Sequence, residues 1–369
     1  MKKENLLLII SLLLAVFVLL FSIYSFSTKK EPETEIKQEV LKEEEIVETE
    51  ILPEDIEPEV KKEFVHSAWI PAWDFDNGFK SLEKYKDLIS SVNPVLYGVN
   101  SDGTLLNRKP SEESLKKFLA FCDINGIEVL PTVGSYDYKI MDSVMGSEVY
   151  IDKQVEEIIK EVEKYDFDGI DIDFEKIRVA QKDGYLLFLK KLQTELHMKE
   201  KKLSVTVIAK TREATIDTLA VQDWKVIGEL ADQFKIMTYD YTLQSSTIPG
   251  PIAPIDWMKE VIDYANVSVP SEKIFLGIHL YAYLWKGDKA SALTYSSVQN
   301  LLNNSSITQE YKSDIAEGYS KYTCSDGSSC ILYFQNKQGV SQRVSLAKES
   351  NLLGVSYWRL GSELDLLDQ

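Results

Sequence analysis

Three acidic residues alternate with apolar residues in the segment "GIDIDFE" (169–175) of this 369-residue chain. The acidic residues are Asp171, Asp173 and Glu175. The apolar residues, which have the spacing of a core strand, are Ile170, Ile172 and Phe174. Residues two apart on a strand are separated by about 6.6 Å at the backbone, and side chains can close that distance. The segment therefore predicts a strand that carries three neighbouring carboxyl groups on one face.

Carboxyl groups this close cannot all ionise at their ordinary pKa, so at least one should keep a proton near neutral pH. A protonated carboxyl group is suited to general acid catalysis. The alternative is that Lys or Arg side chains from neighbouring strands pair with the acids, but Lys235 is the only evident inward basic residue on the other predicted strands. Because an unpaired buried acid costs several kcal/mol, a catalytic role is favoured.

Eight short apolar segments alternate with amphipathic stretches beyond residue 64, which predicts an α/β fold, a (β/α)8 TIM barrel. In such a barrel the strand side chains alternate between the interior and the helix layer, so the three acids should point inward and climb towards the C-terminal mouth. Helix 111–127 has Ser111 as a possible N-cap and Asn125-Gly126 as its stop. The eight predicted strands are 65–73, 94–100, 128–134, 169–174, 203–209, 234–240, 274–283 and 352–360.

A small insertion after the seventh strand, at about 284–340, is expected to build one wall of a cleft. Within it Cys324 and Cys330 bracket "SDGSS", a turn sequence between two strand-like segments. A disulfide across the mouth of this hairpin is sterically plausible, and two free thiols remain the alternative. Cys122 is expected to be a small buried apolar residue on a helix.

The N-terminal part of the chain differs in composition from the rest. Residues 6–26 carry no charge and are long enough to span a lipid bilayer, which favours an uncleaved anchor in residues 1–28 over a cleaved signal peptide. Residues 29–63 are rich in glutamate and lack aromatic side chains, which predicts an acidic, disordered linker. The expected location is the cell membrane, with a single span and with the domain at 64–369 outside the cytoplasm.

The formal net charge is −18, and residues 31–63, with 14 acidic residues and 4 lysines, supply 10 of these negative charges. No basic stripe is visible, so we expect no nucleic-acid partner. The three histidines are far apart and no Cys/His cluster has ligand spacing, so we expect no metal and no cofactor.

The segment "DGIDIDFE" (168–175) resembles the D-G-x-D-x-D-x-E motif of glycoside hydrolase family 18, the chitinases and related N-acetylglucosaminidases. "MTYDY" (237–241) is similar to the Met-x-Tyr-Asp segment of this family, and "YWRLG" (357–361) is similar to its last strand. "GPIAPIDW" (250–257) and "KIFLGIHLYAYLW" (273–285) resemble the branch that contains spore-cortex and germination hydrolases. The resemblance covers about residues 65–369. It departs from that branch in lacking LysM repeats and in carrying His279 and Ala282.

The resemblance implies substrate-assisted catalysis with retention of anomeric configuration, an exception to the two-carboxylate mechanism. Glu175 would be the general acid and then the base. Asp173 would orient the 2-acetamido group of the sugar, whose carbonyl oxygen attacks the anomeric carbon. Asp171 would hydrogen-bond Asp173 and hold the shared proton, and Tyr239 would donate its hydroxyl to the acetamido carbonyl.

Several other residues are candidates for sugar binding. By resemblance Trp358 floors the sugar site, with core packing as the alternative, and Asp240 contacts the same acetamido sugar. Met237 and Tyr97 line the pocket or pack in the core. Asp168 has the opposite parity to the three acids and is expected to be structural. Further aromatic platforms, each weakly indicated, are Trp69, Trp73, Tyr281, Tyr283 and Trp285.

The resemblance thus implies a hydrolase of β-1,4-linked polysaccharides that contain N-acetylglucosamine, with peptidoglycan, chitin or an N-glycan core as the substrate. A catalytically inactive, lectin-like protein on the same fold is the alternative. Its usual mark is loss of the last acid of the motif, and Glu175 is present.

Overall fold

The computed structural model describes residues 63–303 and 307–368. The predicted membrane anchor and almost all of the predicted linker lie outside these residues. Within the described ranges, no helix combines the length and the apolar character needed to cross a bilayer.

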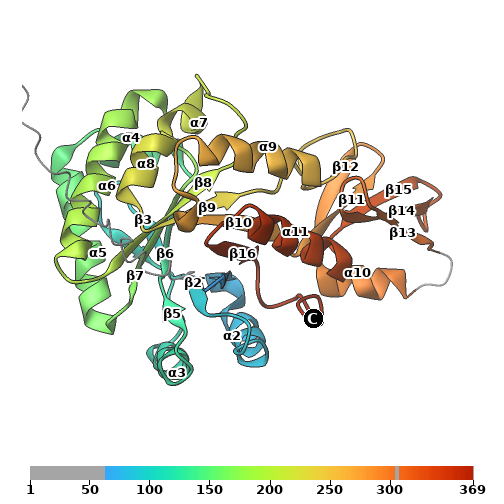
Figure 1. Ribbon diagram of the computed structural model, residues 1–369, viewed down its shortest axis with the longest axis horizontal. Coiled ribbons are helices and arrows are strands. Elements are labelled where there is room, and N and C mark those ends of the chain that lie inside the picture. Colours follow the sequence, from blue (N-terminus) through green and yellow to red (C-terminus); the bar gives the residue numbers. More distant parts are fainter. Residues whose placement is uncertain (1–62, 304–306, 369) are drawn as a thin grey trace, which may run out of the picture. The chain divides into compact units, whose positions relative to one another are not determined.

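Parallel strands form the central barrel-like sheet, and helices surround it (Figure 1). The pairing runs from β6 through β7, β8, β9, β10, β16, β1 and β2 to β5. β5 and β6 are consecutive parts of one chain segment, so the last strand of this order lies next to the first. The sheet therefore closes into a barrel around an interior, as the sequence predicts. The strands are β1 Val65–Pro71, β2 Ser91–Val95, β3 Tyr97–Val99, β5 Glu128–Val129, β6 Thr132–Ser135, β7 Gly169–Phe174, β8 Lys202–Ile208, β9 Gln233–Met237, β10 Ile274–His279 and β16 Gly354–Trp358.

The second and third barrel strands are interrupted, unlike the continuous strands expected from the sequence. β2 ends at Val95 and β3 begins at Tyr97, while Leu130 and Pro131 separate β5 from β6. Proline has no backbone N–H to donate, which explains the second break. β3 also pairs with a short antiparallel strand, β4 (Leu105–Asn107). The break between β2 and β3 changes the direction in which the following side chains point, including that of Tyr97.

Helices pack on the outer face of the sheet, and the apolar residues of β7 lie in this layer. Phe174 stacks on Phe188 with ring centroids 5.6 Å apart. In α3 the side chain of Ser111 accepts from the N–H of Ser114, and Gly126 follows the helix with a φ of 64°, as predicted. The helices around the sheet are α2 Phe75–Lys84, α3 Glu112–Ile124, α4 Tyr138–Met145, α5 Glu148–Tyr165, α6 Lys182–His197, α7 Asp217–Val221, α8 Trp224–Leu230, α9 Ile255–Asn266 and α11 Lys337–Glu349.

The insertion is a five-stranded antiparallel sheet with one helix. Its strand order is β12-β11-β15-β14-β13. It spans 281–334 rather than 284–340, because β11 starts directly after β10 and α11 already belongs to the barrel. Its elements are β11 Tyr281–Lys286, β12 Lys289–Thr294, α10 Tyr295–Leu302, β13 Gln309–Lys312, β14 Glu317–Thr323 and β15 Ser329–Phe334.

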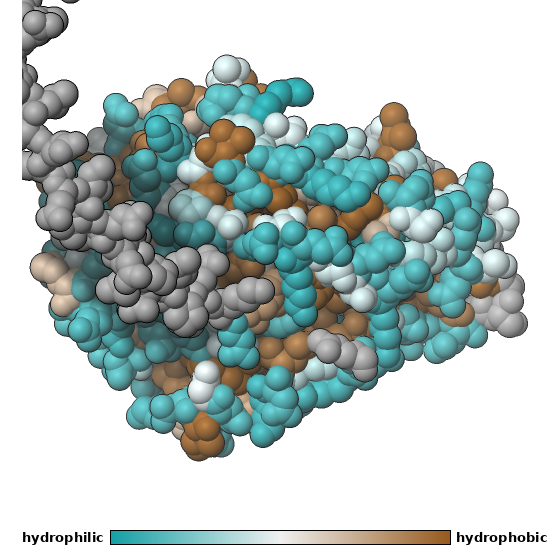
Figure 2. Space-filling view, viewed as in Figure 1, coloured by the Kyte–Doolittle hydropathy of each residue, from teal (hydrophilic) through white to brown (hydrophobic). Residues whose placement is uncertain are grey.

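The predicted disulfide joins Cys324 and Cys330 at the end of the β14–β15 hairpin, with their Cα atoms 5.7 Å apart. Cys122 is a buried free thiol on α3, also as predicted. On the face shown in Figure 2, hydrophilic side chains predominate and apolar ones are scattered between them.

A buried ion pair ties the insertion to the barrel. The guanidinium of Arg343 on α11 lies 3.5 Å from the carboxylate of Glu317 on β14, and both side chains are fully buried. Glu317 accepts the backbone N–H groups of Ile252 and Ala253, in the segment that precedes α9. Arg343 donates to the carbonyl oxygens of Ala253 and Ala316. One charged pair thus joins three separate parts of the chain.

Candidate active site

Asp171 is the innermost of the three acids and is fully buried. The sheet register places Thr132 on one side of it and Ser204 on the other. The hydroxyls of Thr132 and Ser204 donate to its carboxylate at 2.8 and 2.7 Å, and Thr206 and the Trp69 indole N–H add donors at 3.0 and 3.3 Å. These four donors hold the carboxyl group of Asp171 in place.

Asp173 lies one layer closer to the mouth, between Gly134 and Thr206. The Tyr136 hydroxyl donates to one carboxylate oxygen at 3.0 Å, and the other oxygen has no hydrogen-bond partner among the described residues. A side chain at Gly134 would meet the Tyr136 hydroxyl, so this glycine makes room for the contact. Burial, then the charges of Glu175 and Asp171, raise the pKa of Asp173 well above its usual value.

Glu175 follows the end of β7 and is half-buried at the pocket. Its backbone N–H donates to the carbonyl oxygen of Ser135, which fixes the chain at the end of the strand. Burial, and after it the charge of Asp240, raise the pKa of Glu175, while Lys176 acts in the opposite direction. The predicted retention of a proton within the acid cluster is therefore supported at both Asp173 and Glu175.

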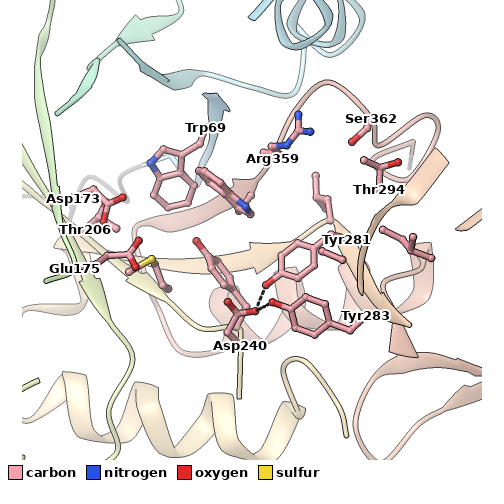
Figure 3. Close-up of a pocket in the computed structure, with 16 residues that line it drawn as sticks. Trp69, Asp173, Glu175, Thr206, Asp240, Tyr281, Tyr283, Thr294, Arg359 and Ser362 are labelled. Carbon is pink, nitrogen blue, oxygen red and sulfur yellow. Dashed lines mark hydrogen bonds between the residues drawn. The ribbon is translucent and has the colours of Figure 1, made fainter. Parts of the chain in front are cut away.

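Tyr239 and Asp240 follow β9 after one residue, Thr238, and both line the same pocket. Figure 3 shows Asp240 there. Asp240 adopts a φ of 59° and accepts hydrogen bonds from the hydroxyls of Tyr281 and Tyr283 on β11, the latter at 2.7 Å. Burial and the surrounding carboxylates, Asp173 first, raise the pKa of Tyr239 well above its usual value. Its hydroxyl therefore stays protonated and can donate a hydrogen bond.

An aromatic group lies on the opposite side of the pocket. The ring of Trp358, at the end of β16, lies 6.1 Å from that of Trp69 and 6.5 Å from that of Trp73, both in edge arrangements. Trp69 is buried, whereas Trp73 is 69% exposed. The indole of Trp358 thus provides an apolar surface facing the pocket, as expected for a sugar floor.

Lys235 lies inside the barrel, below the acids. Its ammonium group donates to Ser67 and Asn93. Burial lowers its pKa to about 8, against the opposing effect of the charges of Asp171 and Glu128. It forms no ion pair with the acids among the described residues, so the alternative in which basic side chains neutralise them is not what the structure shows.

These side chains line a cavity of about 350 Å³ at the C-terminal mouth of the barrel (Figure 3). A size of ~300–1000 Å³ is usual for small-molecule sites. The lining combines the barrel with the insertion, which forms one wall as expected. The residues are Trp69, Asp173, Glu175, Thr206, Met237, Tyr239, Asp240, Leu280, Tyr281, Tyr283, Ala292, Leu293, Thr294, Trp358, Arg359 and Ser362.

Most of the predicted site residues line this pocket, but four do not: Asp171, Trp73, Tyr97 and Trp285. Asp171 lies below the pocket, and Trp73 is exposed beside Trp358. Tyr97 was expected as a possible pocket residue, but it is 1% exposed and its hydroxyl donates to Glu161 on α5, in the helix layer. Trp285 was expected as a sugar platform, but it is buried within the insertion and donates to the carbonyl oxygen of Ser246. Asp168 accepts the N–H of Val129, the structural role predicted for it.

The expected hydrogen bond between Asp171 and Asp173 does not form, because Thr132, Ser204, Thr206 and Trp69 already satisfy Asp171. His279 is fully buried and does not line the pocket; its ring lies 5.3 Å from that of Tyr281.

Sequence analysis missed Tyr136, the hydroxyl donors around Asp171, and the pocket residues Thr294, Arg359 and Ser362. The parity of Thr132 and Ser204 on their strands could have indicated the donors. Tyr136 gave no signal because it follows a strand end. Among the described residues, no group of three or more His, Cys, Asp or Glu side chains could hold a metal ion.

The arrangement is suited to acid–base chemistry on a bound polar ring. Glu175 is a carboxyl group with a raised pKa at the pocket edge, Asp173 is a buried carboxyl group with a free oxygen, and Tyr239 is a hydroxyl donor. Fixed groups of this kind stabilise charge that develops in a transition state.

Comparisons with known proteins give the family. Residues 73–363 match the model of Glycosyl hydrolases family 18. The cortical fragment-lytic enzyme of Bacillus subtilis is 26% identical over 212 residues, covering 56% of this chain and 49% of that enzyme. The enzyme of the same name from Bacillus anthracis is 27% identical over 289 residues, covering 73% and 66%. The chain thus spans about half to two thirds of the length of these relatives.

Solved structures agree in fold. A chitinase from Chromobacterium violaceum superposes with a TM-score of 0.74 at 25% identity, over 82% of this chain and 95% of that chain. The Bacillus cereus spore cortex-lytic enzyme SleL superposes with a TM-score of 0.74 at 22% identity, over 82% and 72%. With the acidic motif at the mouth of the barrel and a family match over most of the described residues, the chain belongs to glycoside hydrolase family 18.

Proposed function

We propose that this protein hydrolyses β-1,4-linked glycans that contain N-acetylglucosamine, by substrate-assisted catalysis with retention of configuration. The observation that carries the proposal is the placement of Asp173, Glu175 and Tyr239 around one pocket floored by Trp358. Among the described residues, no further carboxyl group is available there as a nucleophile, since Asp171 lies below the pocket and Asp240 is held by two tyrosine hydroxyls.

In the first step Glu175 donates its proton to the glycosidic oxygen, and the bond from that oxygen to the anomeric carbon breaks. The acetamido carbonyl oxygen of the same sugar forms a new bond to the anomeric carbon and gives an oxazolinium ion. Asp173 accepts the acetamido N–H through its free carboxyl oxygen and holds the group in place. Tyr239 donates its hydroxyl to the acetamido oxygen and orients it for attack.

In the second step the ionised Glu175 takes a proton from water, and the water oxygen attacks the anomeric carbon. The ring of the oxazolinium opens and restores the acetamido group. Two inversions at one carbon give net retention. The charge of Asp171, which lies beneath Asp173, contributes to the raised pKa of Asp173, and Asp173 keeps its proton through both steps.

We propose peptidoglycan as the polymer, since relatives of the chain include cortical fragment-lytic enzymes of Bacillus species. Chitin is the second candidate, because a chitinase shares the fold over most of the chain. The charge-free residues 6–26 support attachment to a cell membrane with the barrel outside, followed by the acidic spacer at 29–63. The disulfide agrees with an oxidising location.

The test compares chito-oligosaccharides with their deacetylated counterparts and with purified peptidoglycan strands. The proposal predicts new reducing ends from the acetylated glycans alone, with the β-anomer as the first product in NMR spectra. Hydrolysis of the deacetylated chains at the same rate would contradict substrate assistance. Binding without any hydrolysis would support the lectin-like alternative instead.

A further inference from the structure

The pocket has two ends of different construction. Figure 3 shows Asp173 and Glu175 at one end, and Thr294 and Ser362 at the other. Thr294 closes β12 of the insertion, while Ser362 lies in the turn that follows β16 of the barrel. The far end is therefore formed jointly by the insertion, which is one wall of the pocket, and by the barrel, which is the opposite wall.

A backbone hydrogen bond joins these walls beyond the pocket. The N–H of Ser296, in the first turn of α10, donates to the carbonyl oxygen of Ser362 at 3.1 Å. The hydroxyls of Thr294 and Ser296 lie 3.0 Å apart on the insertion side. The contact forms a bridge across the end of the cleft that lies opposite Glu175.

The barrel side of this bridge is held firmly. The buried carboxylate of Glu363 accepts the N–H groups of Gly361 and Ser362 at 2.7 and 3.0 Å. Arg359 forms an ion pair with Asp74 at 2.6 Å, and both side chains are largely buried. The N–H of Leu360 donates to the carbonyl oxygen of Trp69 at 3.1 Å. These bonds leave the turn at 359–363 little freedom to move aside.

The chemistry fixes which part of the substrate meets the bridge. Glu175 must lie at the bond that breaks, and the reacting sugar must lie over Trp358, next to Tyr239. The rest of the glycone, the part on the non-reducing side of that bond, then extends away from Glu175, towards Thr294 and Ser362. The leaving part of the chain departs past Glu175 at the other end.

We propose, on the basis of the function given above, that the enzyme acts at the non-reducing ends of glycan chains and accepts a glycone of at most two sugars. One sugar lies over Trp358 and the second lies between Leu293 and Arg359. The bridge between Ser296 and Ser362 blocks a third. The products released from a long chain are then short and uniform, whatever the length of the substrate.

The test uses 4-methylumbelliferyl glycosides of one, two and three N-acetylglucosamine units, with the full chain as enzyme. Free fluorophore appears only when the whole glycone lies on the bridge side of Glu175. We expect release from the disaccharide glycoside to exceed release from the trisaccharide glycoside by about tenfold or more in kcat/KM. Equal release from both would overturn the inference. No release from any of the three would contradict the proposed function itself.

Ser296→Pro tests the bridge directly, because proline removes the donor N–H and is tolerated in the first turn of a helix. It should raise the trisaccharide-to-disaccharide ratio, and Ser296→Ala, which keeps the N–H, should leave that ratio unchanged. An unchanged ratio in Ser296→Pro would contradict the blocking role.

Ser362→Trp is a second, independent variant, in which a larger side chain fills the far end of the pocket. It should reduce release from the disaccharide glycoside more than release from the monosaccharide glycoside. Equal effects on both substrates would place the far end outside the glycone site.

Discussion

At the scale of single residues, the three acids of β7 have different surroundings and therefore different tasks. Asp171 is surrounded by hydroxyl and indole donors, which hold its carboxyl group in place. Asp173 has a single hydrogen-bond donor within the described part of the chain, and its pKa is raised by burial and by two neighbouring charges. Glu175 lies at the edge of the same group, where its proton can reach a substrate. The alternation of β7, continued to Glu175 directly after the strand, produces this gradient.

The charges beside Glu175 should set the upper pH limit of activity. The negative charge of Asp240 raises the pKa of Glu175, and the positive charge of Lys176 lowers it. Because the acid must be protonated, Asp240→Asn should move the alkaline limb of the kcat/KM profile to lower pH. Lys176→Gln should move it to higher pH, by less, because Lys176 is exposed.

The measurement is the pH profile of hydrolysis for the two variants and the wild type. If the alkaline limb moved in the same direction in both variants, the assignment of Glu175 as the titrating acid would be contradicted. Lys139→Gln, another exposed lysine near this rim of the barrel, serves as the control and should leave the limb in place.

The sequence was sufficient to find the acids, Tyr239, Asp240 and Trp358, because strand alternation and the family motif both point to them. It left Tyr97 between the pocket and the core, and the structure places it in the core. The strand is interrupted between Val95 and Tyr97, so the sequence pattern could not decide between the two. Tyr136 could not be found, because no periodicity applies beyond the end of a strand.

At the scale of elements, the insertion completes the site from outside the barrel. Tyr281 and Tyr283 hold Asp240, and the Glu317–Arg343 pair clamps the segment at 252–253. The N–H of Tyr241 donates to the carbonyl oxygen of Ile252. The buried pair is thereby connected, through this segment, to the turn that carries Asp240.

Removing the cation of this pair should be costly. Arg343→Leu leaves the buried Glu317 without its partner and several carbonyl groups without a donor, and we expect a loss of about 3–5 kcal/mol in the free energy of unfolding. Urea denaturation measures it. Lys117→Leu, which breaks the exposed pair with Glu113, is the control and should change stability by about 1 kcal/mol or less. Equal losses in both variants would contradict the role of the buried pair.

The existence of the insertion and of its disulfide could be predicted, because "SDGSS" between two cysteines is a local turn signal. The pairing of Glu317 with Arg343 could not, since their contact depends on how a distant helix packs. The bounds at 281–334 also differ from those expected, because β11 continues the apolar pattern of β10 almost without a break.

At the scale of the whole molecule, one buried acid should make stability depend on pH. Burial raises the pKa of Glu317 to about 7 from a reference value of 4.5, against the opposing effect of Arg343. The folded protein then binds more protons than the unfolded chain between these values. The contribution of Glu317 to the free energy of unfolding is therefore fully present below pH 4.5 and is lost as the pH rises to about 7.

Urea denaturation at pH 5 and at pH 8 measures this effect, and the Glu317→Gln variant provides the comparison. The wild type should lose more stability than the variant between the two pH values, because the variant has no proton to release at this position. An identical loss in both proteins would show that other groups cause the pH dependence.

The barrel class and the order of its elements could be predicted from the alternation of apolar segments and helices. The far end of the pocket could not, because Ser296 and Ser362 meet only after the insertion has folded back onto the turn that follows β16. Contacts between distant segments carry no local pattern.

The account depends most directly on Glu175 as the proton donor. The decisive measurement is hydrolysis of a chito-oligosaccharide by Glu175→Gln and by the wild type, with binding of the same sugar measured by calorimetry. We expect kcat to fall by about 10²–10⁴-fold while binding persists, since glutamine keeps the shape and removes the acid. Hydrolysis by the variant at the rate of the wild type would contradict the account.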